Sequence, residues 1–461
     1  MSSYRTQKIL LSDNIDDEAY SYLVWCCYQA NSLYNSCLFA VRQAHFELCP
    51  RREFFDSNDQ YRSIFKTRYV TASYAKLCKE FKLNRHYIGL GGQQGQQCLK
   101  SVVEAIESYN KLLEDYWEGK LENCPKIPNY RTSGGMYQVS FPAQAVTYDE
   151  FEGICKLAIS RDCKPELVTP KLTIPAAVGF TSEQLKEVRI VPSCGKLWAE
   201  YIYVAPSVKA NNLNYKQAIG IDPGVTNLLS VVSTKGKSFI VCGKEVKSFN
   251  HRYNKTVAKY KKGKSEFYWD KYLDKITHKR NCRVRDVVNK SARFIINYCL
   301  QHSIGNIVFG WGQGVKNKVN LGKQNNQNFV AIPMARIKNR IKELAESVGI
   351  RFLETEEAYT SKSDYLAGDL IFKFGEKPKE YKFSGRRITR GTYKSRFGLV
   401  SADALGAINI LKKVAIQLGL TLAEVGRESL VVPKRYKLSD MSKLYRKRVE
   451  SRFLTTLEAT A

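Results

Sequence analysis

The sequence has no pair of cysteines in the CxxC spacing, although it contains thirteen cysteines. Apart from the neighbours Cys26 and Cys27 they are scattered singly, and their number is odd. The five histidines form neither an HxH nor an HExxH motif. Because structural zinc sites need clustered thiolates or imidazoles, no such site is expected. We interpret the cysteines as buried thiols of a protein in a reducing compartment.

Long uninterrupted apolar runs are also missing. The uncharged segments 19–41 and 294–315 are broken by polar residues, whereas a membrane-spanning helix needs about 20 nearly continuous apolar residues. The first residues do not lead into an apolar stretch of the kind that a signal peptide has. We therefore expect no membrane partner and a cytoplasmic location, associated with the nucleoid if the source is bacterial.

Acidic residues are few relative to basic ones. The 461 residues include 73 lysines and arginines against 44 aspartates and glutamates, which gives a net charge of +29. An excess of this size predicts a polyanionic partner, with nucleic acid ahead of an anionic membrane. The hydrophobic fraction of 44% is enough for a core, and the length suggests several domains.

The hydrophobic pattern changes along the chain. Residues 15–46, with an acidic first turn, and residues 93–118, with apolar residues at three- to four-residue spacing, are predicted as long helices. The stretch between them is interpreted as further helix and loop. A β-hairpin is predicted over 188–204 around a Ser-Cys-Gly turn. From residue 218 the predicted order is three strands, helix, strand, helix, strand and helix, which matches a ribonuclease-H-like domain.

Two aspartates have the surroundings that phosphate chemistry needs. Asp222 ends the apolar segment 218–222 and precedes a Pro-Gly turn, which leaves space in front of its carboxylate. Asp403 lies in the first turn of a predicted helix, whose small residues, such as Gly406, favour close packing on a sheet. A hard divalent cation takes such oxygen ligands where a phosphate approaches. Taken singly, each aspartate is equally well explained as a turn or cap residue.

Together these segments resemble the RuvC-type nuclease core of the transposon-encoded TnpB proteins, relatives of type V CRISPR effectors and of Fanzor nucleases. The resemblance spans most of residues 15–415. It is also carried by the basic helix at 278–291, the segments 325–333, 359–362 and 385–391, and the helix at 93–118 followed by the Pro-rich basic run 125–131.

The sequence departs from the family pattern at two places. The family usually has its middle catalytic glutamate at the end of the fourth strand, where this chain has Gly310 and no carboxylate. Neighbouring strands lie about 4.8 Å apart, so a glutamate at the end of the next strand is a plausible replacement. Some family members resemble this arrangement, with the middle glutamate moved to that strand, and Glu357 has the corresponding position. Glu356 is the alternative ligand. The interpretation of these glutamates as a solvated acidic strand end stays open. The four-cysteine zinc ribbon of the family is also missing, since 361–400 contains no cysteine.

The resemblance implies a multidomain protein of the α/β plus α+β class. Its C-terminal RuvC or ribonuclease-H-like nuclease domain follows an N-terminal helical recognition region and a β-barrel-like wedge domain. The expected boundaries are 1–14 for the first wedge strand, 15–120 for the recognition domain, 121–210 for the wedge domain, 211–415 for the nuclease domain with a basic helical insertion at 244–290 and a loop at 361–400, and 416–461 for a basic tail.

The implied activity is that of a guide-RNA-directed DNA endonuclease. Asp222, Glu357 and Asp403 are expected to hold two Mg²⁺ ions for phosphodiester hydrolysis. Guide RNA and target double-stranded DNA are the expected partners of a monomer. The residues expected to contact nucleic acid are Lys126, Tyr130, Arg131, Lys279, Arg280, Arg386, Arg387 and Arg390. Two alternatives are a nuclease-inactive, RNA-guided DNA-binding regulator of the same fold and a guide-free resolvase or transposase.

Overall fold

A computed structural model describes residues 2–12, 14–48, 51–55, 60–65, 68–160, 172–206, 210, 212–312 and 333–441. The chain forms two compact units, which we call the N-terminal unit (2–205) and the C-terminal unit (from 206 on). Their boundary lies close to the predicted start of the nuclease domain, and the finer domain boundaries remain predictions. Most of the segment 325–333 and residues 442–461 of the predicted tail lie outside the described residues.

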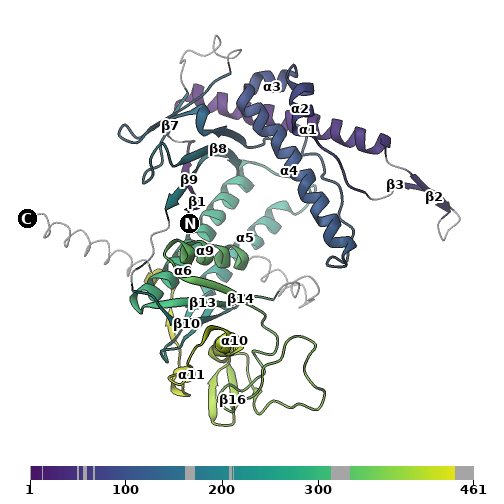
Figure 1. Cartoon of the computed structure of the whole chain (residues 1–461). Coiled ribbons are helices and arrows are strands. Elements are labelled where there is room, and N and C mark those ends of the chain that lie inside the picture. Colours follow the sequence, from purple (N-terminus) through teal and green to yellow (C-terminus); the bar gives the residue numbers. More distant parts are fainter. Residues whose placement is uncertain are drawn as a thin grey trace, which may run out of the picture. The chain divides into compact units, whose positions relative to one another are not determined.

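The N-terminal unit has a helical part, shown in purple and blue in Figure 1. Its helices are α1 (Asp17–Leu48), α2 (Tyr74–Phe81), α3 (Arg85–Leu90), α4 (Gly92–Trp117) and the 3-10 turn η1 (Ala143–Ala145). The long helices α1 and α4 contact each other and bury Leu23, Leu33, Leu99 and Ile106 in one core. The two long helices predicted from the sequence are therefore confirmed.

The strands of the N-terminal unit form small antiparallel sheets. They are β1 (Ser2–Leu10), β2 (Arg51–Phe55), β3 (Tyr61–Phe65), β4 (Val139–Pro142), β5 (Val146–Asp149), β6 (Ile154–Leu157), β7 (Leu172–Pro175), β8 (Leu185–Ser193) and β9 (Lys196–Pro206). The order β1-β9-β8-β4 places the first strand beside the predicted hairpin, which is confirmed. Residues Cys194 and Gly195 turn this hairpin with positive φ.

The hairpin β2–β3 corrects the interpretation of its region as helix and loop. Its five register pairs run from Arg51–Phe65 to Phe55–Tyr61. These strands are rich in phenylalanine and tyrosine, which favour extended backbone, and they have no apolar repeat of helical period. The sequence signal was the aromatic content, not an alternation of apolar and polar residues.

The C-terminal unit is built on a six-stranded sheet in the order β14-β13-β10-β11-β12-β18. Its strands are β10 (Asn214–Pro223), β11 (Asn227–Ser233), β12 (Ser238–Cys242), β13 (Ile304–Gly310), β14 (Arg351–Thr355) and β18 (Lys434–Tyr436). The first three strands are antiparallel neighbours, and β13 and β14 run parallel to β10. This is the predicted ribonuclease-H-like order, so the predicted fold is confirmed.

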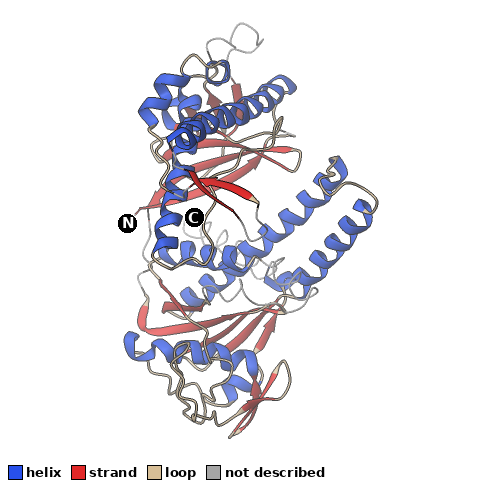
Figure 2. Ribbon diagram, turned by 90° about the vertical axis from the view of Figure 1, so that its right-hand side faces the viewer, coloured by secondary structure: helices blue, strands red, loops and turns tan. Residues whose placement is uncertain are grey.

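Helices cover both faces of this sheet, as the lower part of Figure 2 shows. They are α5 (Lys244–Lys261), α6 (Lys271–Gln301), α9 (Met334–Ser347), α10 (Ala402–Leu418) and the short α11 (Glu428–Val431). Successive side chains of strand β13 point to opposite faces of the sheet. Phe309 packs in the core with α6 and α9, whereas Val308 packs with α10. The sheet is therefore buried on both sides, which fits the continuous apolar runs of its central strands.

The predicted loop at 361–400 contains a small sheet of β15 (Arg386–Arg387), β16 (Thr392–Ser395) and β17 (Gly398–Ser401). The buried carboxyl of Asp364 joins the start of this segment to the sheet, since it accepts hydrogen bonds from Ser395 Oγ at 2.9 Å and from the Arg396 amide at 3.0 Å. Strand β15 is only two residues long and carries no apolar pattern, which explains why the sequence predicted a loop.

Two predictions concerned cysteine and membrane segments. The cysteines within the described residues are free, and most of them are buried or partly buried. Burial raises the pKa of the Cys27 and Cys37 thiols to about 12, so these thiols stay protonated and act as small apolar groups. In the described part of the chain, no helix has the length and hydropathy of a membrane span.

Candidate active site

The ends of three neighbouring strands meet at one edge of the six-stranded sheet. The parallel register places Ile221 of β10 opposite Phe309 of β13, and Gly310 opposite Thr355 of β14. Asp222 therefore lies next to the end of β13, and the residues after Thr355 lie one strand further along. This is the edge at which α/β sheets place their functional side chains.

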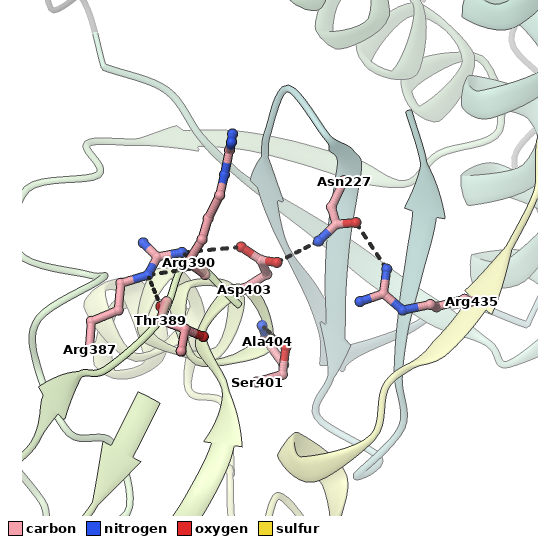
Figure 3. Close-up of polar contacts among 8 residues, drawn as sticks. All are labelled: Asn227, Arg387, Thr389, Arg390, Ser401, Asp403, Ala404 and Arg435. Carbon is pink, nitrogen blue, oxygen red and sulfur yellow. Dashed lines mark hydrogen bonds and ion pairs between the residues drawn. The ribbon is translucent and has the colours of Figure 1, made fainter. Parts of the chain in front are cut away.

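Asp403 reaches this edge from the first turn of α10. The Ser401 hydroxyl caps the helix by accepting a hydrogen bond from the Ala404 amide. The Asp403 carboxylate lies between two partners, as Figure 3 shows: Asn227 Nδ2 donates to Oδ2 at 2.5 Å, and Arg387 Nη2 lies 3.7 Å from Oδ1. Both carboxylate oxygens of Asp403 therefore have a fixed neighbour.

Two glycines allow α10 to lie close to the sheet. A Cβ atom on Gly406 would be 2.3 Å from Asp222 Oδ2, and one on Gly220 would be 2.3 Å from the carbonyl oxygen of Ala407. Real Cβ contacts are never that short, so neither position tolerates a larger residue without movement. The expectation that small residues let this helix pack closely is confirmed, and the Gly406 contact brings α10 directly against the carboxylate of Asp222.

Glu357 fills the space beside the end of β13. A Cβ atom on Gly310 would lie 3.1 Å from Cγ and 3.2 Å from Oε1 of Glu357. The Glu357 side chain therefore extends to the end of β13, where Gly310 itself provides no carboxylate.

The turn that carries Glu357 is fastened to α10. The buried Asn409 side chain donates to the carbonyl oxygens of Thr360 and Ser363, both at 2.8 Å. Thr360 in turn donates its hydroxyl to the Glu357 carbonyl at 2.9 Å, and Tyr359 between them has a positive φ of 61°. Helix α10 thus positions all three acids: it carries Asp403, contacts Asp222 and holds the backbone after Glu357.

The neighbouring glutamates point to other partners. Glu356 Oε1 lies 3.0 Å from Nζ of Lys413, and Glu354 Oε2 lies 2.6 Å from Nζ of Lys338. Glu357 is the glutamate beside Gly310 and near Asp222, which favours it over Glu356 as the middle acid. The interpretation as a solvated strand end describes Glu354 and Glu356 better than Glu357.

The three acids repel one another. Burial raises the pKa of the Asp222 carboxyl well above its usual range, and the negative charges of Glu357 and Asp403 raise it further. The Arg387 guanidinium acts in the opposite direction. Within the described residues, no three His, Cys, Asp or Glu side chains already form a metal cage. The donor set itself is chemically suited to a hard divalent cation, which would relieve this repulsion.

Comparison with known proteins identifies part of the chain. Residues 201–312 match the OrfB_IS605 family model, described as a probable transposase. This segment is similar to that family, and the match covers about a quarter of the chain. It contains strands β10 to β13 and Asp222, so the resemblance to TnpB proteins is confirmed over the first four strands of the central sheet. No curated protein matches the chain.

Two solved structures are also similar to the chain. One, the cryo-EM structure of a Cas12f1-sgRNA-target DNA complex, has 12% identity and a TM-score of 0.31, covering 88% of this chain and 98% of that chain. The other, a CRISPR-Cas12f ternary complex, has 13% identity and a TM-score of 0.31, covering 86% of this chain and 85% of that chain. TM-scores of this size establish neither a common fold nor a common function.

The predicted nucleic-acid residues of the N-terminal unit lie on an extended segment beside α1. Lys126, Tyr130 and Arg131 are exposed. The Arg131 guanidinium stands 3.6 Å from the ring centroid of Tyr137, and Arg42 stands 5.0 Å from that of Tyr130. Tyr130 and Arg131 thus already have cation–π partners within the unit.

The predicted nucleic-acid residues of the C-terminal unit differ in accessibility. Lys279, Arg386 and Arg390 are exposed. Arg280 is partly buried, and its Nε donates to Asn250 Oδ1 at 2.9 Å, which joins α6 to α5. Arg387 faces Asp403, and its Nε also donates to the carbonyl oxygen of Arg390 at 3.1 Å. Arg387 is therefore the predicted basic residue that the structure brings to the acids.

The sequence did not indicate three positioning residues. Asn409 lies within the apolar run of α10, and only its polar character was a signal. Asn227 follows the Asp-Pro-Gly turn and begins β11, so its place at the same edge as Asp222 could have been deduced from the predicted turn. Arg435, whose Nη1 donates to Asn227 Oδ1 at 3.0 Å, belongs to strand β18 within the predicted tail.

Proposed function

We propose that this protein is an RNA-guided DNA endonuclease with a metal-dependent, RuvC-like site. The observation that carries the proposal is the convergence of Asp222, Glu357 and Asp403 at one edge of a ribonuclease-H-like sheet. Carboxylates that repel one another in a partly buried place are costly unless a cation offsets them. Their presence together favours a cation site over a structural role.

Each acid has a proposed role in this site. Asp222, Glu357 and Asp403 would hold two Mg²⁺ ions, which would supply an activated water and stabilise the leaving oxygen. Asn227 orients the Asp403 carboxylate by its hydrogen bond to Oδ2. Arg387 compensates the acids and is placed to meet a phosphate of the strand that approaches them.

The partners follow from charge and from the family. A net charge of +29 favours a nucleic-acid partner, and the family model that residues 201–312 match describes a probable transposase, a class of enzyme that acts on DNA. We assign guide RNA and target double-stranded DNA as the partners of a monomer. The N-terminal helical and wedge domains, within the boundaries 1–14, 15–120 and 121–210, hold the RNA–DNA heteroduplex and read a short flanking motif. The nuclease domain, 211–415, cuts.

The test starts from the full chain purified with its bound RNA. Sequencing that RNA identifies a guide, and DNA carrying the matching target is then incubated with Mg²⁺. We expect cleavage by the unmodified protein, none by Asp222→Asn or Asp403→Asn, and the same amount of bound RNA in all three. Glu376→Gln, an exposed acid at the surface of the 361–400 segment, serves as the control and should cut normally.

Three results would overturn this proposal in different ways. Undiminished cutting by either aspartate variant would remove those residues from the site. Target binding by the unmodified protein without any cutting would favour the nuclease-inactive regulator, to which the missing acid at Gly310 points. Action on DNA by protein freed of RNA would favour the guide-free resolvase or transposase.

A further inference from the structure

The turn between α5 and α6 exposes a group of aromatic side chains. We call residues 260–272 the aromatic tip. Phe267 is 89% exposed, Trp269 50% and Tyr272 43%. Single exposed aromatic residues are common on proteins, but three within six positions of one turn are an unusual concentration of exposed apolar surface that calls for a partner.

Hydrogen bonds hold the aromatic tip in a fixed shape. The Asp270 side chain caps α6 by accepting from the Leu273 amide at 2.9 Å. Its other oxygen accepts from the hydroxyls of Tyr260 at 2.6 Å and Tyr268 at 2.8 Å. These bonds, that from Tyr260 first, lower the pKa of Asp270 to about 2, so the anchor stays ionised at neutral pH. A rigid platform loses little entropy when it binds a ligand.

The indole of Trp269 is oriented as well. Its Nε1 donates to Asp274 Oδ1 at 2.9 Å, which fixes the ring plane while half of the side chain stays exposed. The acids Asp270 and Asp274 are thus both engaged by donors of the tip itself.

Lysines surround these rings. Lys264 Nζ lies 3.6 Å from the ring centroid of Tyr260 and 4.1 Å from that of Tyr268, and Lys261 Nζ lies 5.9 Å from that of Trp269. The exposed Lys262 and Lys271 add to them. Over residues 244–290 the chain has 15 lysines and arginines against five acids.

We infer that the aromatic tip is a stacking site for an unpaired base of bound RNA. Aromatic faces accept any base, and adjacent lysines attract the phosphates on either side of it. Duplex DNA keeps its bases stacked inside the helix, whereas RNA loops and ends offer unpaired ones. The inference rests on the proposed RNA partner, but it does not depend on the three acids or on cleavage.

The test measures RNA affinity of the full chain after removal of co-purified RNA. The probe is an oligouridine of about 12 nucleotides, within the usual site sizes, with a DNA oligomer of the same length beside it. We expect Phe267→Ala and Trp269→Ala each to weaken RNA binding roughly five- to 150-fold, the usual range for loss of one stacked base. Trp269→Phe should restore most of the affinity, since it keeps a ring.

The salt dependence separates stacking from charge. Phe267→Ala should leave the slope of log affinity against log salt unchanged, because no charge is lost. Lys262→Gln should reduce the slope by about 0.7, the value for one phosphate contact on a single strand. Phe151→Ala is the control: this side chain is 95% exposed but lies among Asp149, Glu150 and Glu152, so RNA affinity should not change.

A photo-crosslink gives the position directly. RNA carrying 4-thiouridine should crosslink to a peptide that contains residues 260–272 in the unmodified protein and lose that crosslink in Phe267→Ala. Unchanged RNA affinity in both alanine variants, a loss confined to the DNA oligomer, or a change in oligomeric state instead of RNA affinity would each overturn the inference. A protein that binds RNA at the tip but cuts no DNA would support it while refuting the proposed nuclease.

Discussion

The C-terminal unit contains two groups of carboxylates that are built in opposite ways. Asp364 and Asp369 are buried and surrounded by donors: the Leu366 amide reaches Asp364 Oδ1 at 3.1 Å, and Ser384 donates both its amide and its hydroxyl to Asp369. At Asp222, by contrast, no hydrogen-bond donor contacts the carboxylate within the described residues, and the nearest charged groups include two further acids.

This difference in hydrogen bonding distinguishes a structural group of carboxylates from a functional one. Carboxylates that accept several backbone and hydroxyl hydrogen bonds have their charge satisfied inside the fold, so they stabilise a structure. A carboxylate such as that of Asp222, which is buried near two further acids, destabilises the fold until a cation binds, so it indicates a site. Asp364 and Asp369 stabilise the segment 361–400 by accepting hydrogen bonds from its residues. This segment contains no cysteine and is the place where the resembled family has its zinc ribbon.

Removal of Asp364 should have the largest effect on stability. Asp364→Ala would leave Ser395 Oγ and the Arg396 and Leu366 amides without their acceptor, at a cost of roughly 1–3 kcal/mol for each buried group. We expect a loss of about 3 kcal/mol or more, concentrated in residues 361–400, visible as faster amide hydrogen exchange there.

The matched control is Glu376→Ala in the same segment, which should change exchange little because this residue is exposed. Protection of 361–400 that survives Asp364→Ala would mean that the small sheet, rather than the buried acid, holds the segment together.

Separate substitutions of the two adjacent glutamates test the contrast at the candidate site. Glu357→Gln removes a charge beside Asp222, and we expect at least a hundredfold loss of cleavage and weaker Mn²⁺ binding by calorimetry, since a ligand is worth several kcal/mol. Glu356→Gln alters the pair with Lys413 and the hydrogen bond from the Phe374 amide, and we expect less than a threefold change in cleavage, because neither contact involves the three acids. The reverse ranking would make Glu356 the middle acid.

Gly406 tests whether α10 sets the position of Asp222. In Gly406→Ala the new methyl group would lie 2.3 Å from Asp222 Oδ2 and would displace it. A shift of about 1 Å in a reacting group costs on the order of a hundredfold in rate. Gly426→Ala is the control, because its Cβ has open space and its backbone is not in the left-handed region. Equal cleavage by the two variants would show that Asp222 tolerates the displacement.

The sequence predicted the central sheet well because its strands are continuous apolar runs that end at recognisable turns. It also placed Asp222 and Asp403 correctly relative to those elements. It could not decide between Glu356 and Glu357, since the choice depends on a turn with a positive φ at Tyr359 that no pattern indicates. Asn409 escaped notice for a similar reason: its two hydrogen bonds join segments 46 and 49 residues apart in the chain.

The short strands were also beyond prediction. The elements β15 and β18 span two and three residues, are rich in arginine and lysine, and exist only because neighbouring strands pair with them. Tertiary contacts therefore decide where Arg387 and Arg435 lie, and both residues act at the Asp403 carboxylate, one directly and one through Asn227.

The smallest expected effect is that of Asp222→Asn on the thermal stability of the metal-free protein. The pKa of Asp222 is raised in the folded state, whereas its pKa in the unfolded chain is about 3.9. Between these two pKa values the folded state binds more protons than the unfolded state, so the free energy of unfolding falls as the pH rises through the folded pKa. Asp222→Asn removes that cost and should raise the melting temperature at pH 8 in EDTA, by about 2–4 °C for each kcal/mol relieved. The two proteins should converge near pH 4. Added Mg²⁺ should stabilise the unmodified protein more than the variant. A variant less stable than the unmodified protein at pH 8 would place Asp222 with Asp364, as a structural acid.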